Sequence, residues 1–219
     1  MSLPIHPIME QSFAVIDKEI GEHNFSPAEY AIVRRVIHST ADFEFKDLIV
    51  FSPHAIAAGI AAIRDRSPII TDVGMVKQGI AGLVAQTFNN PLICAVEQAT
   101  SALPGKTRTE TGLIQCALEF PKAIFVIGNA PTALNALCNQ LPTTVVPPLV
   151  IGAPVGFISV LESKARLAQT PVNQIRVEGR KGGSPVASAI LNALIVLAWD
   201  LEAEEQRSRG AEEQRRIYT

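Results

Sequence analysis

The sequence predicts an α/β fold in three layers, with a doubly wound parallel sheet between two layers of helices. Hydrophobic residues make up 47% of the chain but aromatic residues only 5%. The core is therefore expected to consist of Ala, Val, Ile and Leu, the composition of buried parallel strands flanked by helices. Short apolar runs alternate along the chain with segments of helical periodicity. Charged residues make up only 18%, which argues against a disordered chain.

Two helices are expected before the sheet. Apolar residues recur with the helical period between Ile8 and Ile20 and predict an amphipathic first helix. The second helix has a strong start signal, because Ser26 can cap it, Pro27 suits its first position and Glu29 completes a capping box. We expect this helix to end near residues 38–40.

Five apolar runs are predicted to be strands: Ser67–Thr71, Leu92–Val96, Ala123–Ile127, Val145–Ile151 and Asn173–Val177. Helices are expected around and between them, at residues 53–64, 75–87, 109–118, 131–141, 157–168 and 185 to about 202. This alternation implies right-handed crossovers and helices on both faces of the sheet. Five strands fit a flavodoxin-like or related doubly wound sheet.

One domain is expected over residues 1–201, because no internal repeat and no linker divides the chain. Residues 202–219 are polar and strongly charged, with few apolar side chains to pack. We expect them to form a frayed or disordered tail.

The overall charge excludes some classes of partner. The formal net charge of -2 gives no indication of a nucleic-acid or anionic-membrane partner. The start of the chain lacks the basic stretch and apolar run of a signal peptide. The longest apolar run, residues 187–199, is broken by Ser188 and Asn192 and is too short to span a bilayer. These features predict a soluble, cytoplasmic protein.

The three cysteines, Cys94, Cys116 and Cys138, are far apart in apolar surroundings. They match no zinc or redox spacing, so buried free thiols in a reducing compartment are expected. The four histidines show no metal-binding spacing either, which makes metal catalysis by the protein unexpected.

The turns that follow the predicted strands indicate where a ligand binds, since ligands of open parallel sheets lie beyond the carboxyl ends of the strands. Three of the five turns contain glycine just before a helix, at residues 128–132, 152–156 and 179–184. In any single turn, glycine is most simply explained as a requirement of a short connection. Three such turns together, one of them carrying Arg180 and Lys181, predict a site for an anionic ligand.

Nucleotide and hydrolase motifs are absent from the sequence. The stretch Gly105-Lys106-Thr107 resembles the end of a P-loop, but Thr100 stands where the first glycine is required. Neither G-x-G-x-x-G nor G-x-S-x-G occurs. The sequence therefore predicts neither a P-loop or dinucleotide-binding site nor a serine nucleophile of the hydrolase type.

His38 falls at the expected carboxyl end of the second helix. The negative end of the helix dipole stabilises an imidazolium there by about 0.3–1 kcal/mol, whereas Arg34, one turn earlier, opposes it. From spacing alone, a surface histidine beside an arginine is the simpler interpretation.

Residues 34–45, RRVIHSTADFEF, resemble the precorrin-8X methylmutase family, which includes the cobalt-precorrin-8 enzymes. The likeness covers nearly the whole chain except the tail. It continues at residues 70–76, 107–108, 128–134, 152–157, 162–164 and 179–184.

The resemblance implies an isomerase of corrin biosynthesis with a flavodoxin-like fold and no cofactor, active as a homodimer with sites near the subunit interface. Its reaction moves a methyl group between adjacent ring carbons of a corrinoid and gives hydrogenobyrinic or cobyrinic acid. The family's catalytic histidine matches His38, which is expected to act as general acid. Substrate-binding positions match Ser12 and Arg35, with Arg108 a weaker match. The acetate and propionate groups of the substrate also explain the basic Arg180 and Lys181.

Two other functions stay open from the sequence. The protein could be a corrinoid carrier that holds its product and hands it transiently to the next pathway enzyme. It could also be a flavodoxin-like flavin or nucleotide binder, although the phosphate-binding motifs are missing.

Overall fold

The computed structural model describes residues 3, 6–141 and 145–217, with residues 210–217 described by their backbone alone. The strands are β1 (Ile49–Phe51), β2 (Ile69–Thr71), β3 (Leu92–Cys94), β4 (Ile124–Ile127), β5 (Leu149–Gly152) and β6 (Gln174–Val177). The helices are α1 (Pro7–Glu19), α2 (Pro27–Thr40), α3 (Phe45–Leu48), α4 (Ala55–Arg64), α5 (Gly74–Gln86), α6 (Ala95–Gln98), α7 (Arg108–Glu119), α8 (Pro131–Gln140), α9 (Val160–Gln169) and α10 (Ser184–Ile217).

The strands form one six-stranded mixed sheet in the order β1-β6-β5-β4-β2-β3. Strands β2 to β6 are parallel and correspond to the five predicted runs, whereas β1 is antiparallel to β6, with Ile49 opposite Val177. The prediction of a five-stranded, wholly parallel sheet is therefore wrong at this edge. Strand β1 is no shorter than β2 or β3, but it directly follows the short helix α3 and pairs with β6 far along the chain, so only that pairing reveals it.

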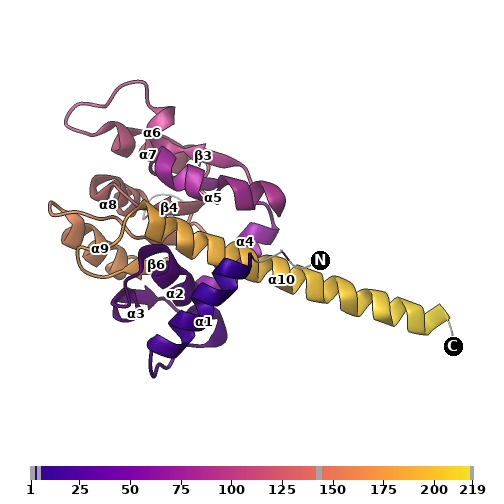
Figure 1. Ribbon diagram of the computed structural model, residues 1–219. Coiled ribbons are helices and arrows are strands. Elements are labelled where there is room, and N and C mark those ends of the chain that lie inside the picture. The colour runs from indigo at the N-terminus through magenta and orange to yellow at the C-terminus, as the bar shows by residue number, and fades with distance from the viewer. Residues whose placement is uncertain (1–2, 4–5, 142–144, 218–219) are drawn as a thin grey trace.

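Side chains that alternate along the central strands fill two separate cores. Val126 of β4 packs with the core under α2, α4, α5 and α10, whereas its neighbours Phe125 and Ile127 face the core under α7, α8 and α9. Figure 1 shows the helices distributed on both sides of the sheet. The α/β fold with helices on both faces is confirmed.

Helix α10 is longer than expected. The sequence predicts its end near residue 202, but the helix continues to Ile217 and extends beyond the body of the protein (Figure 1). Arg64 of α4 lies 2.7 Å from carboxylate oxygens of both Glu202 and Glu205, so ion pairs fix the helix where it leaves the body. The division into a domain at residues 1–201 and a frayed or disordered tail at residues 202–219 stays a prediction.

In the sequence, the apolar run at residues 187–199 is too short to span a bilayer. The helix that contains this run is longer, and by length and composition alone part of α10 could cross a membrane. The qualifying stretch, Ser184–Arg209, has a mean hydropathy of 1.6 over its most apolar window, and 61% of that window is buried inside the protein. This burial is that of a core helix, since α10 packs against α2, α4 and α5.

The predicted capping box at the start of α2 is confirmed. The backbone N–H of Glu29 donates to the Ser26 hydroxyl at 3.3 Å, and the Glu29 carboxylate accepts from the Ser26 backbone N–H at 2.8 Å. The helix ends at Ala41, whose left-handed φ of 53° breaks the helical path. His38 consequently lies in the last turn. The three cysteines are buried free thiols, as predicted.

Candidate active site

His38 is held by the first helix of the chain. Its Nδ1 lies 2.7 Å from the Ser12 hydroxyl of α1. The imidazole also meets the Phe13 ring edge-on, with 5.4 Å between ring centroids. These contacts fix the ring plane and engage Nδ1, so Nε2 is the nitrogen left for proton exchange with a ligand.

His38 lines a cavity of about 310 Å³ formed where α2, α5 and α10 meet. The cavity is lined by Met9, Arg35, His38, Ser39, Met75, Gly79, Ser184, Pro185, Ser188, Ala189 and Asn192. Ser184, Ser188 and Asn192 are spaced four apart and therefore share one face of α10. These three residues were not predicted as site residues. The signal was present in the sequence, because Ser188 and Asn192 are the polar residues that break the apolar run of this helix.

Arg35 joins the His38 cavity to a second cavity of about 590 Å³ between α1, α2, α5 and α10, since it lines both. The guanidinium has no hydrogen bond or ion pair with any residue in the described ranges. Burial lowers the pKa of Arg35, but a guanidinium keeps its charge. A partly buried cation without a counter-ion is suited to bind an anionic ligand group.

The neighbouring Arg34 differs because its charge is already paired. Its guanidinium lies 3.1 Å from a carboxylate oxygen of Asp17 and 4.4 Å from the centroid of the Phe13 ring. Arg34 therefore joins α2 to α1 and fixes the Phe13 ring that contacts His38.

The turn at residues 128–130 does not offer the free N–H groups that its glycine suggests. The buried Asp72, at the end of β2, accepts the backbone N–H groups of Gly128, Asn129 and Ala130 at 3.1, 2.7 and 2.8 Å. Burial raises the pKa of Asp72, and these N–H groups oppose that shift. The turn is thus closed by a protein carboxylate at the point where the strand order reverses, which leaves no phosphate cradle there.

The predicted basic residues Arg180 and Lys181 do not line the His38 cavity. Lys181 is bonded through Nζ to the carboxylates of Asp42 and Glu44, at 2.7 and 2.5 Å. Arg180 is exposed, with its guanidinium carbon 5.9 Å from the centroid of the Phe157 ring. Their contacts with substrate stay predictions.

Arg108, the first residue of α7, is exposed and donates to the backbone carbonyl of Val96 at 2.9 Å. It does not line the His38 cavity. The structure therefore brings Ser12, Arg35 and His38 together and leaves Arg108 outside this group, so its substrate contact also stays a prediction.

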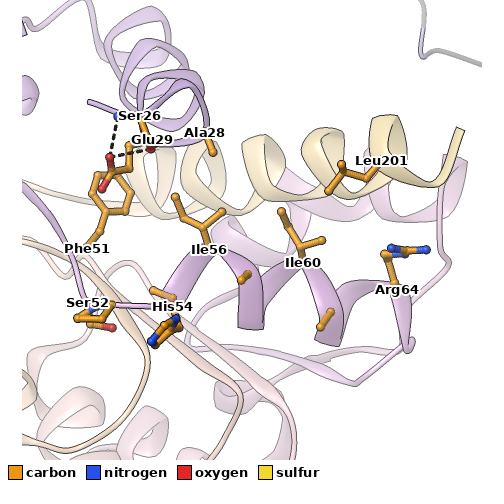
Figure 2. Close-up of a pocket in the computed structure, with 14 residues that line it drawn as sticks. Ser26, Ala28, Glu29, Phe51, Ser52, His54, Ile56, Ile60, Arg64 and Leu201 are labelled. Atoms are coloured by element: carbon orange, nitrogen blue, oxygen red, sulfur yellow. Dashed lines mark hydrogen bonds between the residues drawn. The ribbon is translucent and has the colours of Figure 1, made fainter. Parts of the chain in front are cut away.

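A larger cavity of about 730 Å³ lies elsewhere, between the start of α2, the helix α4 and the residue Leu201 of α10 (Figure 2). Its lining is mostly apolar, and its charged groups have partners. Glu29 is engaged in the capping box, and Arg64 binds two glutamates of α10. Although this cavity is larger than the His38 cavity, its charged groups are already paired, so it is not the candidate active site. Within the described residues, no cluster of His, Cys, Asp and Glu is arranged to hold a metal ion.

Comparison with known proteins connects this geometry to one family. The family model for precorrin-8X methylmutase matches residues 7–197. The cobalt-precorrin-8 methylmutase of Synechocystis sp. is 56% identical over 209 residues, covering 89% of this chain and 96% of the relative. The precorrin-8X methylmutase of Pseudomonas aeruginosa is 37% identical, with coverage of 85% and 93%.

A solved structure supports the same relationship. The precorrin-8x methyl mutase of Thermus thermophilus superimposes with a TM-score of 0.81 at 42% identity, covering 89% of this chain and 98% of that one. The sequence matches extend over the helices that carry His38, Arg35 and Ser12 as well as over the sheet. The chain therefore belongs to the precorrin-8X methylmutase family.

Proposed function

We propose that His38 acts as the general acid in the methyl migration that converts precorrin-8X or cobalt-precorrin-8 into hydrogenobyrinic or cobyrinic acid. As a member of its family, the chain is an isomerase of corrin biosynthesis. The observation that carries the proposal is the 2.7 Å contact of Ser12 with His38, since His38 lines a cavity together with Arg35, a cation without a counter-ion among the described residues.

The contact with Ser12 assigns different tasks to the two ring nitrogens of His38. When Nδ1–H donates to the Ser12 hydroxyl, the other proton of the imidazolium is on Nε2. Transfer of that proton to a substrate ring nitrogen withdraws electron density from the conjugated ring. The bond from the methyl group to one ring carbon then breaks as the bond to the adjacent carbon forms, and the proton returns to Nε2. The reaction is an isomerisation, so substrate and product contain the same atoms and no co-reactant is consumed.

Arg35 is proposed to bind a carboxylate of the substrate. Its charge is present in the free protein without a counter-ion in the described part of the chain, so a ligand carboxylate meets no competing partner. Ser12, predicted to bind substrate, is instead proposed to orient His38, because its hydroxyl is already within hydrogen-bond distance of the imidazole.

Repeated turnover separates the enzyme from a carrier. Purified protein is mixed with about twenty equivalents of precorrin-8X or of cobalt-precorrin-8. The product spectrum is then followed by absorbance over many turnovers. We expect conversion of many equivalents with at least one of the two substrates. Conversion that stops at one equivalent would favour a carrier, and flavin absorbance in the purified protein would favour a flavin binder.

A homodimer is also proposed, on the basis of an exposed apolar patch formed by Val155, Phe157, Ile158 and Leu161. Phe157 and Ile158 are 84% and 82% exposed in the single chain. Contiguous apolar patches on soluble proteins mark interaction sites, and this patch lies beside Arg180. Light scattering after size exclusion should give a dimer for the wild type and a monomer after Phe157→Ser with Ile158→Ser. A doubly substituted chain that stays dimeric would place the interface elsewhere.

Two finer assignments are also proposed, the type of sheet and the cellular compartment. Counted from β2, the parallel strands have the order 2-1-3-4-5, which supports a flavodoxin-like description of this part of the sheet. The three buried free thiols fit a reducing cytoplasm, where we propose that the enzyme acts and hands its product to the next enzyme.

A further inference from the structure

Lys164 of α9 is buried to an unusual degree for a lysine, with 1% of its surface exposed. Burial lowers the pKa of Lys164 to about 8, and no carboxylate within the described ranges forms an ion pair with it. Its Nζ instead donates to two backbone carbonyls, those of Gly179 at 2.8 Å and Lys181 at 2.7 Å. Burying an amine costs free energy, and here the two hydrogen bonds of Lys164 hold the loop at residues 179–181 in one conformation.

These two hydrogen bonds determine how the turn after β6 is oriented. In a trans peptide the carbonyl of one residue and the N–H of the next point in opposite directions. The carbonyls of Gly179 and Lys181 point at Lys164, so the N–H groups of Arg180 and Gly182 point away from it. Neither N–H donates a hydrogen bond to any residue that the structure describes.

The turn is also fixed at its other contacts. The N–H of Gly183 donates to the Ala153 carbonyl at 2.8 Å. Gly182 has a φ of 153°, and a Cβ there would lie 2.4 Å from the same carbonyl oxygen, so only glycine fits. The loop is therefore packed closely against the end of β5, with one set of peptide groups facing inward and the other outward.

The turn borders the His38 cavity. Lys181 pairs with Asp42 and Glu44, which follow His38 in the connection after α2. Ser184, directly after the turn, lines the cavity itself. Two free N–H groups beside an exposed arginine side chain form an arrangement that binds carboxylates.

We propose that Lys164 is a positioning residue that presents the backbone N–H groups of Arg180 and Gly182 to a carboxylate of the corrinoid substrate. This inference rests on the proposed function for the identity of the anion. Lys164 acts only through the loop, because its own amine is consumed by the two carbonyls. Asp72 closes the turn after β4 with a protein carboxylate, whereas here the N–H groups are left for a ligand.

The test uses Lys164→Met, which keeps the length of the side chain but removes the donors, and Lys164→Gln, which keeps an amide donor. The first readout is trypsin cleavage after Arg180 and Lys181 in the absence of substrate, with the fragments identified by mass. The Met variant should be cut at this loop about tenfold faster than the wild type, because the loop opens more often. The Gln variant should lie between the two.

The second readout separates KM from kcat. Loss of the two N–H contacts should raise KM about tenfold in the Met variant and leave kcat within about twofold, with partial rescue in the Gln variant. Two controls should behave as the wild type in both readouts. Ser163→Ala removes a buried hydroxyl of the same helix that bonds only within α9, and Lys122→Met removes an exposed positive charge.

Unchanged cleavage, or faster cleavage with an unchanged KM, would overturn the proposal. Circular dichroism reports whether the Met variant folds, and the Gln variant carries the same test if it does not. If the wild type converts neither corrinoid, the proposed function fails and the carboxylate role fails with it. The cleavage rates would still decide whether Lys164 orders the loop, so the two failures are distinguishable.

Discussion

Replacing Arg35 with methionine should weaken substrate binding without weakening the fold, a combination that a structural arginine would not give. In the free protein the guanidinium is partly buried and has no counter-ion among the described residues, so its removal breaks no ion pair. Burial lowers the pKa of Arg35, which means that the folded state disfavours its charge. The midpoint of thermal unfolding should therefore stay constant or rise in the variant.

The loss of binding follows from the carboxylate contact. A hydrogen bond to a charged group contributes about 1.5–3 kcal/mol, which corresponds to a roughly 10- to 150-fold rise in KM. Arg35→Lys keeps the charge but not the planar pair of donors, so it should recover only part of the affinity.

Steady-state absorbance assays and thermal unfolding of the same preparations measure both effects. Arg64→Met is the matched control, because Arg64 is paired with Glu202 and Glu205 and lies outside the His38 cavity. It should lower the unfolding midpoint and leave KM unchanged. An Arg35→Met protein with wild-type KM would refute the assignment of Arg35 to substrate, whether or not its unfolding temperature falls.

Three further predictions concern His38, the packing of α7 and the charge of Lys164. Ser12→Ala should lower kcat about tenfold, because the imidazole loses the partner that fixes its ring, and Thr40→Ala, whose hydroxyl bonds only within α2, should not. Gly112→Ala should destabilise the protein by about 1–3 kcal/mol in urea unfolding despite the higher helix propensity of alanine, since a Cβ there would lie 1.8 Å from the Ala95 carbonyl oxygen. Gly82→Ala, in open space on α5, should stabilise it by about 0.5–1 kcal/mol, and the same sign for both would contradict this packing. The pKa of Lys164 is lowered to about 8 in the folded state, so the unfolded state binds more protons above that value. The stability of the wild type relative to Lys164→Met should therefore rise between pH 8 and the usual lysine pKa of about 10.4, and a difference that is flat with pH would contradict the lowering of this pKa by burial.

Local signals predicted much of the fold. The capping box of Ser26 and Glu29 lies within one turn of chain, and the apolar runs of β2 to β6 are long enough to recognise. Strand β1 is as short as β2 and β3, but it lies outside the alternation of strands and helices that marks those two, and its strand geometry depends on pairing with β6, more than a hundred residues away. Where α10 runs past its predicted end, Glu202 and Glu205 likewise pair with a distant residue, Arg64, at separations of 138 and 141 residues.

The site shows the same division between local and distant information. The position of His38 in the last turn of α2 follows from where that helix starts and ends. The state of each basic group does not, because it depends on a distant partner. Lys181 finds Asp42 at a separation of 139 residues, and Asp72 reaches the turn at Gly128 across 56 residues. Arg35 and Lys181 are both cations in sequence, and only the structure separates the unpaired one from the paired one.

The most direct test of the account is the turnover of His38→Asn protein alongside its affinity for the product. Asparagine keeps a polar side chain of similar size but cannot act as an acid at neutral pH. We expect kcat to fall by about 10²–10⁴-fold, whereas the dissociation constant for hydrogenobyrinic or cobyrinic acid, measured by absorbance titration, should change by no more than about threefold. A His38→Asn protein that converts precorrin-8X or cobalt-precorrin-8 at a rate near that of the wild type would contradict the central role of His38.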